Sequence, residues 1–301
     1  MSRQARAWLL PLAMLAGGAG YPLFERLAFL APCLIFVMLL LTWCDVSPRA
    51  FRFHRAYWTL LAIQLAGSAV AYAVLSRLSP LLGEGAMICI LAPTAMAAAV
   101  ITAMLGGNAT FAAMYMLVGN LCTAFAAPLF FAWAGAGGDL PFLASAFAIC
   151  SRVLPLLLLP LLVALLLARY LPPVHRVLRR ARPLTYYLWA IGLVIVSGKT
   201  VSFIVAHGSE HLAEEAGLAL VALALCVAQF LVGRRVGKRH GETIPAGQSL
   251  GQKNTVLAIW MAQLYLHPLA SIAPAAYVLW QNSINSYQLW RHDRRASPPR
   301  C

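Results

Sequence analysis

The chain has 301 residues, of which 61% are hydrophobic and 11% are charged, and its mean hydropathy is +0.77. A composition this apolar cannot cover a water-facing surface, so it excludes a soluble globular protein and indicates an integral membrane protein. The formal net charge of +14 is explained by basic loops and by their attraction to anionic lipid headgroups. We therefore expect membrane lipids as partners and no nucleic acid.

Ten apolar stretches, each about as long as a helix that crosses a bilayer, follow one another along the chain. They lie at 7–24, 27–44, 56–76, 82–105, 109–134, 153–170, 184–206, 212–233, 242–266 and 269–290. The basic amino-terminal start resembles a signal peptide, but its apolar stretch continues directly into the second one without a convincing cleavage site. We expect it to be retained as a helix. The predicted fold class is all-α, a polytopic membrane protein with ten transmembrane helices.

The placement of basic residues supports this count, because arginine and lysine in short loops mark the cytoplasmic side. With ten helices, 18 of the 23 basic residues fall on the side that both termini share. Arg26, Arg77, Arg152 and Lys199 map to the opposite side or its helix ends. We expect both termini in the cytoplasm and the protein in a plasma or inner membrane.

The ten stretches form two sets of five around a glycine-rich connector. The predicted domains are a first five-helix repeat at 1–135, a connector with a short amphipathic stretch at 136–151, a second repeat at 152–291 and a cytoplasmic tail at 292–301. Because five is odd, the second repeat is inverted in the membrane, which is the plan of many secondary transporters. Such transporters interrupt one helix at corresponding positions of the two halves.

Breaks are predicted in the fourth and the ninth stretch, each of which is fourth in its half. The fourth stretch carries Pro93 and Thr94 near its middle, and the ninth carries Pro245, Gly247 and Gly251, which weaken helical continuity. Pro93 alone would be interpreted as a kink. Paired with a second break, it is also a candidate binding position.

Lys253 lies inside the ninth apolar stretch. A lysine at the centre of a membrane helix is unfavourable by about 2.5–3.5 kcal/mol, so its charge is expected to face a cavity or a partner. Side chains with oxygen atoms are concentrated around it. The predicted substrate or ion site comprises Lys253, Gln252, Asn254, Thr255, Gln248 and Ser249, with Pro93 and Thr94 of the fourth stretch and Asn282 of the tenth.

Other chemistry finds little support in the sequence. The seven cysteines lack any Cys-x-x-Cys spacing, so no metal or other cofactor is expected. No hydrolase motif occurs, so we do not expect an enzyme. Lys199 lies in a run that superficially resembles a phosphate loop. A structural role is favoured for it, either reaching the membrane surface or pairing with Glu210, Glu214 or Glu215.

Two runs in the carboxyl-terminal half resemble motifs of the bile acid:sodium symporter family. Gly251-Gln252-Lys253-Asn254-Thr255 resembles its Glu-x-Gly-x-Gln-Asn-(Ser/Thr) motif, and Trp280-Gln281-Asn282 its Trp-(His/Gln)-Asn signature. Residues 92–95 and 102–109 resemble the family's fourth-helix region. The resemblance implies a panel of stretches 1, 2, 6 and 7 against a core of stretches 3–5 and 8–10. Stretches 4 and 9 would cross at unwound centres.

The sodium-site positions of that family are altered in this chain. Ser249 stands in place of a sodium-ligating glutamate, and Lys253 in place of a sodium-ligating glutamine. The other altered ligand or hydroxyl positions are Ala98, Ala99, Ala112 and Met116. Because two cations in one pocket repel each other, the resemblance implies that the Lys253 ammonium occupies the second sodium position. We expect it to be held by unwound carbonyls and by Gln248, Ser249 or Gln252.

The sequence therefore predicts a secondary active transporter of a small organic anion that works by alternating access. It is expected to be independent of sodium or coupled to H⁺, with Na⁺ the less favoured coupling ion. Lys253 would be a fixed counter-ion or a proton carrier, since desolvation favours the neutral amine. Two alternatives remain open: a sodium-coupled symporter of the bile-acid type, and a non-transporting membrane sensor or scaffold on the same fold.

Overall fold

The computed structural model describes residues 12–44, 54–95, 97–135, 141–181, 184–207 and 212–296. After helical residues 12–19, its elements are α2 (Tyr21–Arg26), η1 (Ala28–Leu30), α3 (Ala31–Trp43), α4 (Arg55–Leu75), α5 (Pro80–Leu91), α6 (Ala97–Met104), α7 (Ala109–Trp133), α8 (Phe142–Tyr170), α9 (Pro172–Arg180), α10 (Leu184–His207), α11 (Leu212–Lys238), α12 (Thr243–Gly251), α13 (Thr255–Tyr265), η4 (Pro268–Ser271) and α14 (Ile272–Ala296). No strand occurs in these described ranges, where one isolated bridge pairs Thr94 with Lys253. The predicted all-α class is confirmed.

Both predicted helix breaks are present. In the fourth stretch α5 ends at Leu91 and α6 begins at Ala97, and in the ninth α12 ends at Gly251 and α13 begins at Thr255. Pro93 explains the first break, because a residue before proline avoids the helical region. Ala92 accordingly has φ −48° and ψ 137°.

The glycines of the ninth stretch have another role than the predicted weakening of the helix. α12 is helical through Gly247 as far as Gly251. A Cβ at Gly251 would stand 2.5 Å from the Phe230 ring, and a Cβ at Gly233 would stand 2.5 Å from the carbonyl oxygen of Ala246. The missing side chains therefore let α11 and α12 pack with their backbones in close approach, as small residues do between membrane helices.

The connector between the two halves differs from the prediction. The part of the expected connector from Phe142 onward is the beginning of α8, which continues through Pro155 and Pro160 to Tyr170. No proline lies between Phe142 and Pro155, so no backbone donor is missing over this stretch and the helix has no reason to end within it. The short helix α9 follows and was not predicted, although Pro172 at its first position is a helix-start signal.

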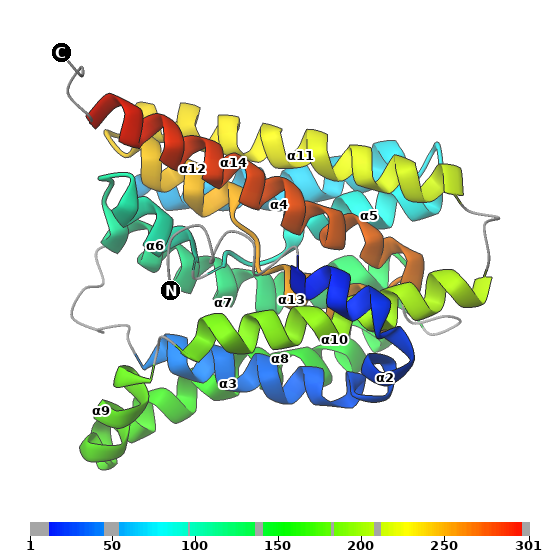
Figure 1. Cartoon of the computed structure of the whole chain (residues 1–301), viewed down its shortest axis with the longest axis horizontal. Helices are drawn as coiled ribbons and strands as arrows, with labels where there is room; N and C mark the ends of the chain where they lie inside the picture. Colours follow the sequence, from blue (N-terminus) through cyan, green and yellow to red (C-terminus); the bar gives the residue numbers. More distant parts are fainter. Residues whose placement is uncertain are drawn as a thin grey trace.

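The helices are arranged in two layers (Figure 1). One layer contains α2, α3, α8 and α10, and the other contains α4, α5, α11, α12 and α14, while α7 and α13 lie between them. These layers follow the division into panel and core stretches that the family resemblance implied. The basic helix α9 projects from one end of the first layer (Figure 1).

Three helices of the described ranges, α4, α7 and α11, are long and apolar enough to cross a membrane by themselves. Further apolar segments are shorter, and two of them, α5 and α13, are halves of the broken stretches. Large apolar side chains such as Phe29, Trp58 and Val70 are exposed, as expected where lipid rather than water surrounds a helix. Ten membrane crossings and an inverted repeat remain a prediction.

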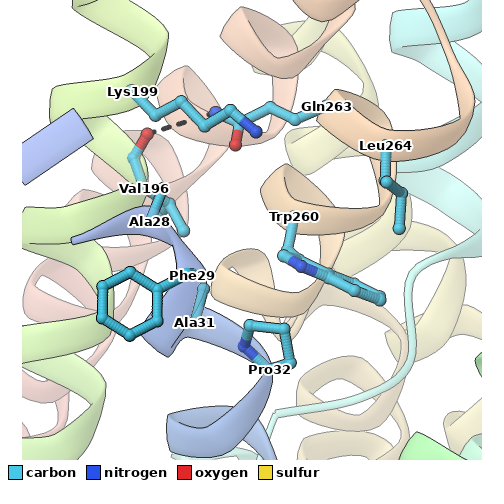
Figure 2. Close-up of a pocket in the computed structure, with 9 residues that line it drawn as sticks. All are labelled: Ala28, Phe29, Ala31, Pro32, Val196, Lys199, Trp260, Gln263 and Leu264. Atoms are coloured by element: carbon cyan, nitrogen blue, oxygen red, sulfur yellow. Dashed lines mark hydrogen bonds between the residues drawn. The ribbon is translucent and has the colours of Figure 1, made fainter. Parts of the chain in front are cut away.

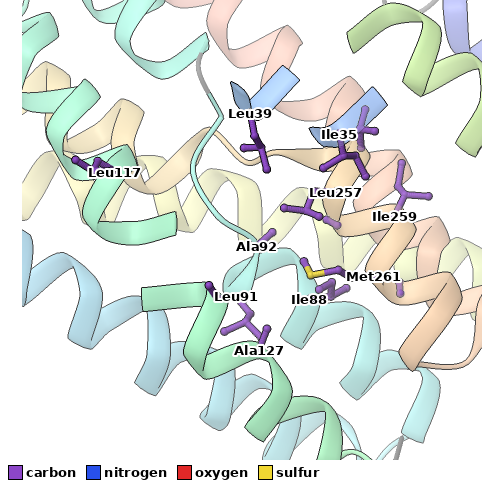
Figure 3. Close-up of a cluster of buried hydrophobic side chains, with 14 of the residues drawn as sticks. Ile35, Leu39, Ile88, Leu91, Ala92, Leu117, Ala127, Leu257, Ile259 and Met261 are labelled. Carbon is purple, nitrogen blue, oxygen red and sulfur yellow. The ribbon is translucent and has the colours of Figure 1, made fainter. Parts of the chain in front are cut away.

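The main apolar core surrounds the segment that follows α5. Figure 3 shows Ile35 and Leu39 of α3 together with Leu117 of α7 and Leu257 and Met261 of α13 around Leu91 and Ala92. Between membrane helices, where lipid rather than water is the alternative neighbour, the close packing of these side chains holds the layers together through van der Waals contacts. The unwound segments are thereby enclosed by hydrophobic side chains.

Candidate functional site

The two unwound segments lie antiparallel to each other and are joined by main-chain hydrogen bonds. The Asn254 amide donates to the Pro93 carbonyl oxygen at 2.8 Å, and the Ala95 amide donates to the Gln252 carbonyl oxygen at 3.0 Å. These bonds flank the bridge between Thr94 and Lys253. The carboxyl ends of α5 and α12 and the amino ends of α6 and α13 therefore come together at one crossing.

Lys253 is buried at this crossing, with 1% of its surface exposed. Its Nζ donates to the carbonyl oxygen of Ile90 at 2.7 Å. Ile90 lies in the last turn of α5, where the helix dipole is negative and unsatisfied carbonyls accept bonds, so a cation is favoured there. The predicted burial of the charge against a partner is observed.

A main-chain carbonyl holds the ammonium, which was one part of the expectation, but the three side chains that were expected to hold it do not. Within the described residues, its hydrogen bond goes to α5 and none goes to Gln248, Ser249 or Gln252. The antiparallel pairing explains this, because it directs the side chain of Lys253 across the crossing and away from its own half-helix.

Side chains also bind the remaining carbonyls at the end of α5. The Gln229 amide donates to Cys89 at 3.3 Å, and the Gln64 amide donates to Leu91 at 3.0 Å and to Ala92 at 3.3 Å. The Thr123 hydroxyl donates to Leu91 at 3.2 Å. Every carbonyl from Cys89 to Ala92 thus has a side-chain donor, counting Lys253 at Ile90.

The end of α12 is bound by hydroxyl groups. The Thr94 hydroxyl donates to the carbonyl oxygen of Ser249 at 2.8 Å, and the Tyr277 hydroxyl donates to that of Gly251 at 2.9 Å. Thr94 is 1% exposed. Of the predicted residues, five therefore join Lys253 at the crossing through side-chain or main-chain bonds: Pro93, Thr94, Ser249, Gln252 and Asn254.

Gln281 is a central residue of the crossing that was not among the predicted site residues. Its Oε1 accepts from the amide of Lys253 at 2.9 Å, and its Nε2 donates to the Lys253 carbonyl at 3.3 Å. Its neighbour Asn282, the predicted site residue, donates to Val278 of its own helix at 2.8 Å. The Trp-Gln-Asn run located the position, but only the helix orientation shows which amide faces the crossing.

The other predicted residues lie around α12 and the start of α13. Gln248 donates to Gln288 at 2.9 Å and accepts from Gln252 at 3.3 Å. The side chain of Asn254 accepts from Leu257 and begins α13. Three oxygens have no partner within the described residues although they are buried: Ser249 Oγ, Gln252 Oε1 and Thr255 Oγ1. Water or a cation could occupy such positions, since buried polar atoms are normally paired.

Each half of the chain contributes a glutamine and a tyrosine bonded to each other. The Tyr115 hydroxyl donates to Gln64 Oε1 at 3.0 Å, and the Gln229 amide donates to the Tyr277 hydroxyl at 3.0 Å. Gln64 and Gln229 come from the third and eighth apolar stretches, and the tyrosines from the fifth and tenth. Corresponding stretches thus provide the same residue types at the crossing.

One pocket of about 260 Å³ opens beside α13, between this helix and the first layer. Its lining residues are Ala28, Phe29, Ala31, Pro32, Val196, Lys199, Trp260, Gln263 and Leu264. Figure 2 shows Lys199 and Gln263 at one end of it and Phe29, Trp260 and Pro32 toward the other. The Gln263 amide donates to Val196 O at 3.2 Å and to Thr200 Oγ1 at 2.8 Å, and so joins α13 to α10.

An apolar, all-helical chain in which two broken helices cross at a buried charge has the architecture of an integral membrane transporter. The chain belongs to the SBF-like CPA transporter family, whose profile matches residues 49–283. A search of curated proteins finds no match to the chain. The resemblance that the sequence motifs suggested is confirmed at the level of the family.

Proposed function

We propose that the protein is a secondary active transporter of a small organic anion, with Lys253 in place of a coupling sodium ion and with transport that is sodium-independent or coupled to H⁺. The observation that carries the proposal is the bond from Lys253 Nζ to the Ile90 carbonyl, at 2.7 Å. An ammonium fixed at the carboxyl end of a half-helix occupies the kind of position where broken-helix transporters bind cations.

The geometry of the crossing supports an anionic substrate. The amino ends of α6 and α13, at Ala97 and Thr255, meet at the crossing. Helix amino ends carry partial positive charge and bind anionic groups in transporters of this plan. The ammonium of Lys253 adds a full positive charge, and within the described residues no carboxylate bonds to it.

Alternating access would use an inverted repeat, and the two glutamine–tyrosine pairs support such a repeat. Gln64 and Tyr115 in the first half correspond by stretch number to Gln229 and Tyr277 in the second. The two breaks, each in the fourth stretch of its half, are related in the same way. In this proposal the two layers rock against each other around the crossing.

Sodium-coupled symport is the second candidate, and one observation favours it. The buried oxygens of Ser249, Gln252 and Thr255 without a partner are the atoms that a cation would accept as ligands. The nearby ammonium weighs against sodium, because two cations in a low-dielectric site repel each other strongly.

Flux into proteoliposomes tests the proposal and separates the two candidates. Suitable labelled probes are pyruvate, benzenesulfonate and taurocholate, which are small, aromatic and sterol anions that cross bare bilayers slowly. We expect uptake of at least one probe, unchanged within about twofold when choline replaces sodium, because an ion that does not bind cannot shift the equilibrium. A steep sodium dependence would establish the second candidate, and absence of flux for all three would contradict the proposal.

A pH gradient then distinguishes the two roles of Lys253. If the lysine carries a proton, an imposed gradient drives uptake, and uptake moves protons in return. If it is a fixed counter-ion, flux is indifferent to the gradient. Lys253→Gln provides the control, because it restores the glutamine that the bile acid:sodium symporter family has at this position. Ser249 would still stand in place of that family's glutamate, so we expect folded protein with greatly reduced flux.

A further inference from the structure

The pocket beside α13 has a polar end and an apolar end. Phe29 and Leu264 line it and are 73% and 48% exposed. Together with Pro32 and Trp260 they form the apolar end of the pocket, which is open to a ligand (Figure 2). Pockets for small molecules combine such apolar walls with a few polar groups that fix the ligand's orientation.

Lys199 supplies the charge at the polar end. It is exposed in α10, and the expected pairing with Glu214 is not observed: Ser79 donates to that carboxylate at 3.4 Å. Glu25, on the neighbouring helix α2, accepts from Ser202 at 2.6 Å. Glu210 lies outside the described residues. Among the described carboxylates, none forms an ion pair with Lys199.

Gln263 limits what else the polar end can bind. Its amide nitrogen is committed to Val196 O and Thr200 Oγ1. The carbonyls that line this end are those of helices, which are already engaged in helical hydrogen bonding. The remaining strong donor is the ammonium, which prefers an anion, and no acidic side chain lines the pocket that would hold a cation.

We propose that this pocket binds a small amphiphilic carboxylate, with its carboxylate on Lys199 and its apolar body against Phe29 and Trp260. A volume of about 260 Å³ fits a ligand of roughly a dozen heavy atoms, at the lower limit of small-molecule pockets. Since the pocket lies between the first layer and α13, a transported anion bound there would contact both the first layer and a half-helix of the crossing. The role of the pocket as a substrate site rests on the proposed function, whereas the binding of a carboxylate in it does not.

Calorimetric titration of the full-length protein in uncharged detergent tests the assignment with three matched probes. Phenylacetate is the anion, phenylacetamide its neutral analogue and phenethylamine its cationic analogue. We expect phenylacetate to bind and the other two to bind at least about tenfold more weakly, because each lacks the charge-assisted contact to the ammonium. Equal binding of phenylacetamide would overturn the proposal.

Variants locate the site. Lys199→Met should weaken phenylacetate binding at least about tenfold, and Lys199→Arg should retain it, because the charge is kept. Arg77→Met is the matched control, since Arg77 is an exposed cation of the loop after α4 and does not line the pocket. We expect Arg77→Met to bind phenylacetate with wild-type affinity. Affinity that is unchanged in Lys199→Met, or that falls equally in Arg77→Met, would contradict the assignment.

Two further outcomes are distinguishable. If phosphatidylglycerol added to the micelles binds in a Lys199-dependent way and phenylacetate does not, the site is a lipid headgroup site and the carboxylate assignment is wrong. Because binding is measured without a gradient, failure of the flux experiment would contradict the transport proposal and leave a positive titration standing. Flux of an anion with unaltered affinity in Lys199→Met would contradict this inference alone.

Discussion

The carboxyl ends of α5 and α12 meet at the crossing with similar backbones and different partners. At α5, four successive carbonyls from Cys89 to Ala92 accept side-chain donors, one of them the ammonium of Lys253. At α12, the donors to Ser249 and Gly251 are the neutral hydroxyls of Thr94 and Tyr277. The comparison teaches that the second half of the chain supplies the charge at the crossing and the first half accepts it.

The largest effect is expected where the charge is removed. Lys253→Met should fold, since it removes an intramembrane cation, but its flux in proteoliposomes should fall to the level of empty liposomes. Lys253→Arg should fail as well, because a guanidinium is wider and needs a planar set of acceptors, whereas the ammonium bonds one carbonyl. Near-normal flux in Lys253→Met would show that the end of α5, which binds the ammonium, and the end of α12, which binds neutral hydroxyls, are functionally equivalent.

The next largest effect is expected at the residue that holds the Lys253 backbone. Gln281→Leu leaves the buried N–H and carbonyl of Lys253 without partners, which should destabilise the protein by about 3 kcal/mol. The measurement is unfolding by SDS in mixed micelles. Asn282→Leu is the matched control, because Asn282 bonds only its own helix, and its unfolding free energy should change by less than about 0.5 kcal/mol. Similar losses in both would mean that the Lys253 backbone needs no such support.

A smaller loss is expected at the contact between α11 and α12. Gly233→Ala places a Cβ 2.5 Å from a backbone oxygen that cannot move without its helix, and overpacking of this kind costs about 2 kcal/mol. In Gly67→Ala, the new Cβ would be 3.6 Å from the Ile90 side chain, an ordinary contact. The same SDS titration should show no loss for Gly67→Ala. A stable Gly233→Ala would indicate that α12 can be displaced from α11.

The smallest effect is expected at the carboxyl end of α12, where the donors are neutral hydroxyl groups. Thr94→Val removes the donor to the Ser249 carbonyl and should lower the unfolding free energy by about 1 kcal/mol. Thr94→Ser keeps the hydroxyl and should lie closer to the wild type. If Thr94→Val abolished flux as completely as Lys253→Met does, the hydroxyl would be as important as the ammonium, and the contrast between the two ends would be lost.

Local sequence signals predicted much of this arrangement, because proline acts on its own neighbours and a charge in an apolar run needs a partner wherever it lies. Pro93 thus located the first break, and Lys253 located the crossing. The identity of the partner could not be predicted in the same way. It depends on the antiparallel orientation of two segments far apart in the chain, which brings Lys253 to Ile90.

Two errors have related causes. Gly247 weakens an isolated helix, but packing against α11 outweighs that local preference, so α12 continues through it and ends only at Gly251. Gln281 and Asn282 are neighbours of similar chemistry, and only the rotation of α14 about its axis decides which amide reaches the Lys253 backbone. Ten crossings remain a prediction because several of the helices are too short to be identified as spans individually.

The glycine contacts between α11 and α12 also have a consequence for how these two helices can move. A Cβ at Gly237 would collide with the Glu242 carbonyl, and one at Gly233 with the Ala246 carbonyl. The backbones of the two helices are therefore in contact at two successive turns next to their connection. At these two glycines no side chain separates the helices, so we expect α11 and α12 to move as one unit. We therefore expect a displacement of α12, the half-helix that leads to Lys253, to move α11 as well.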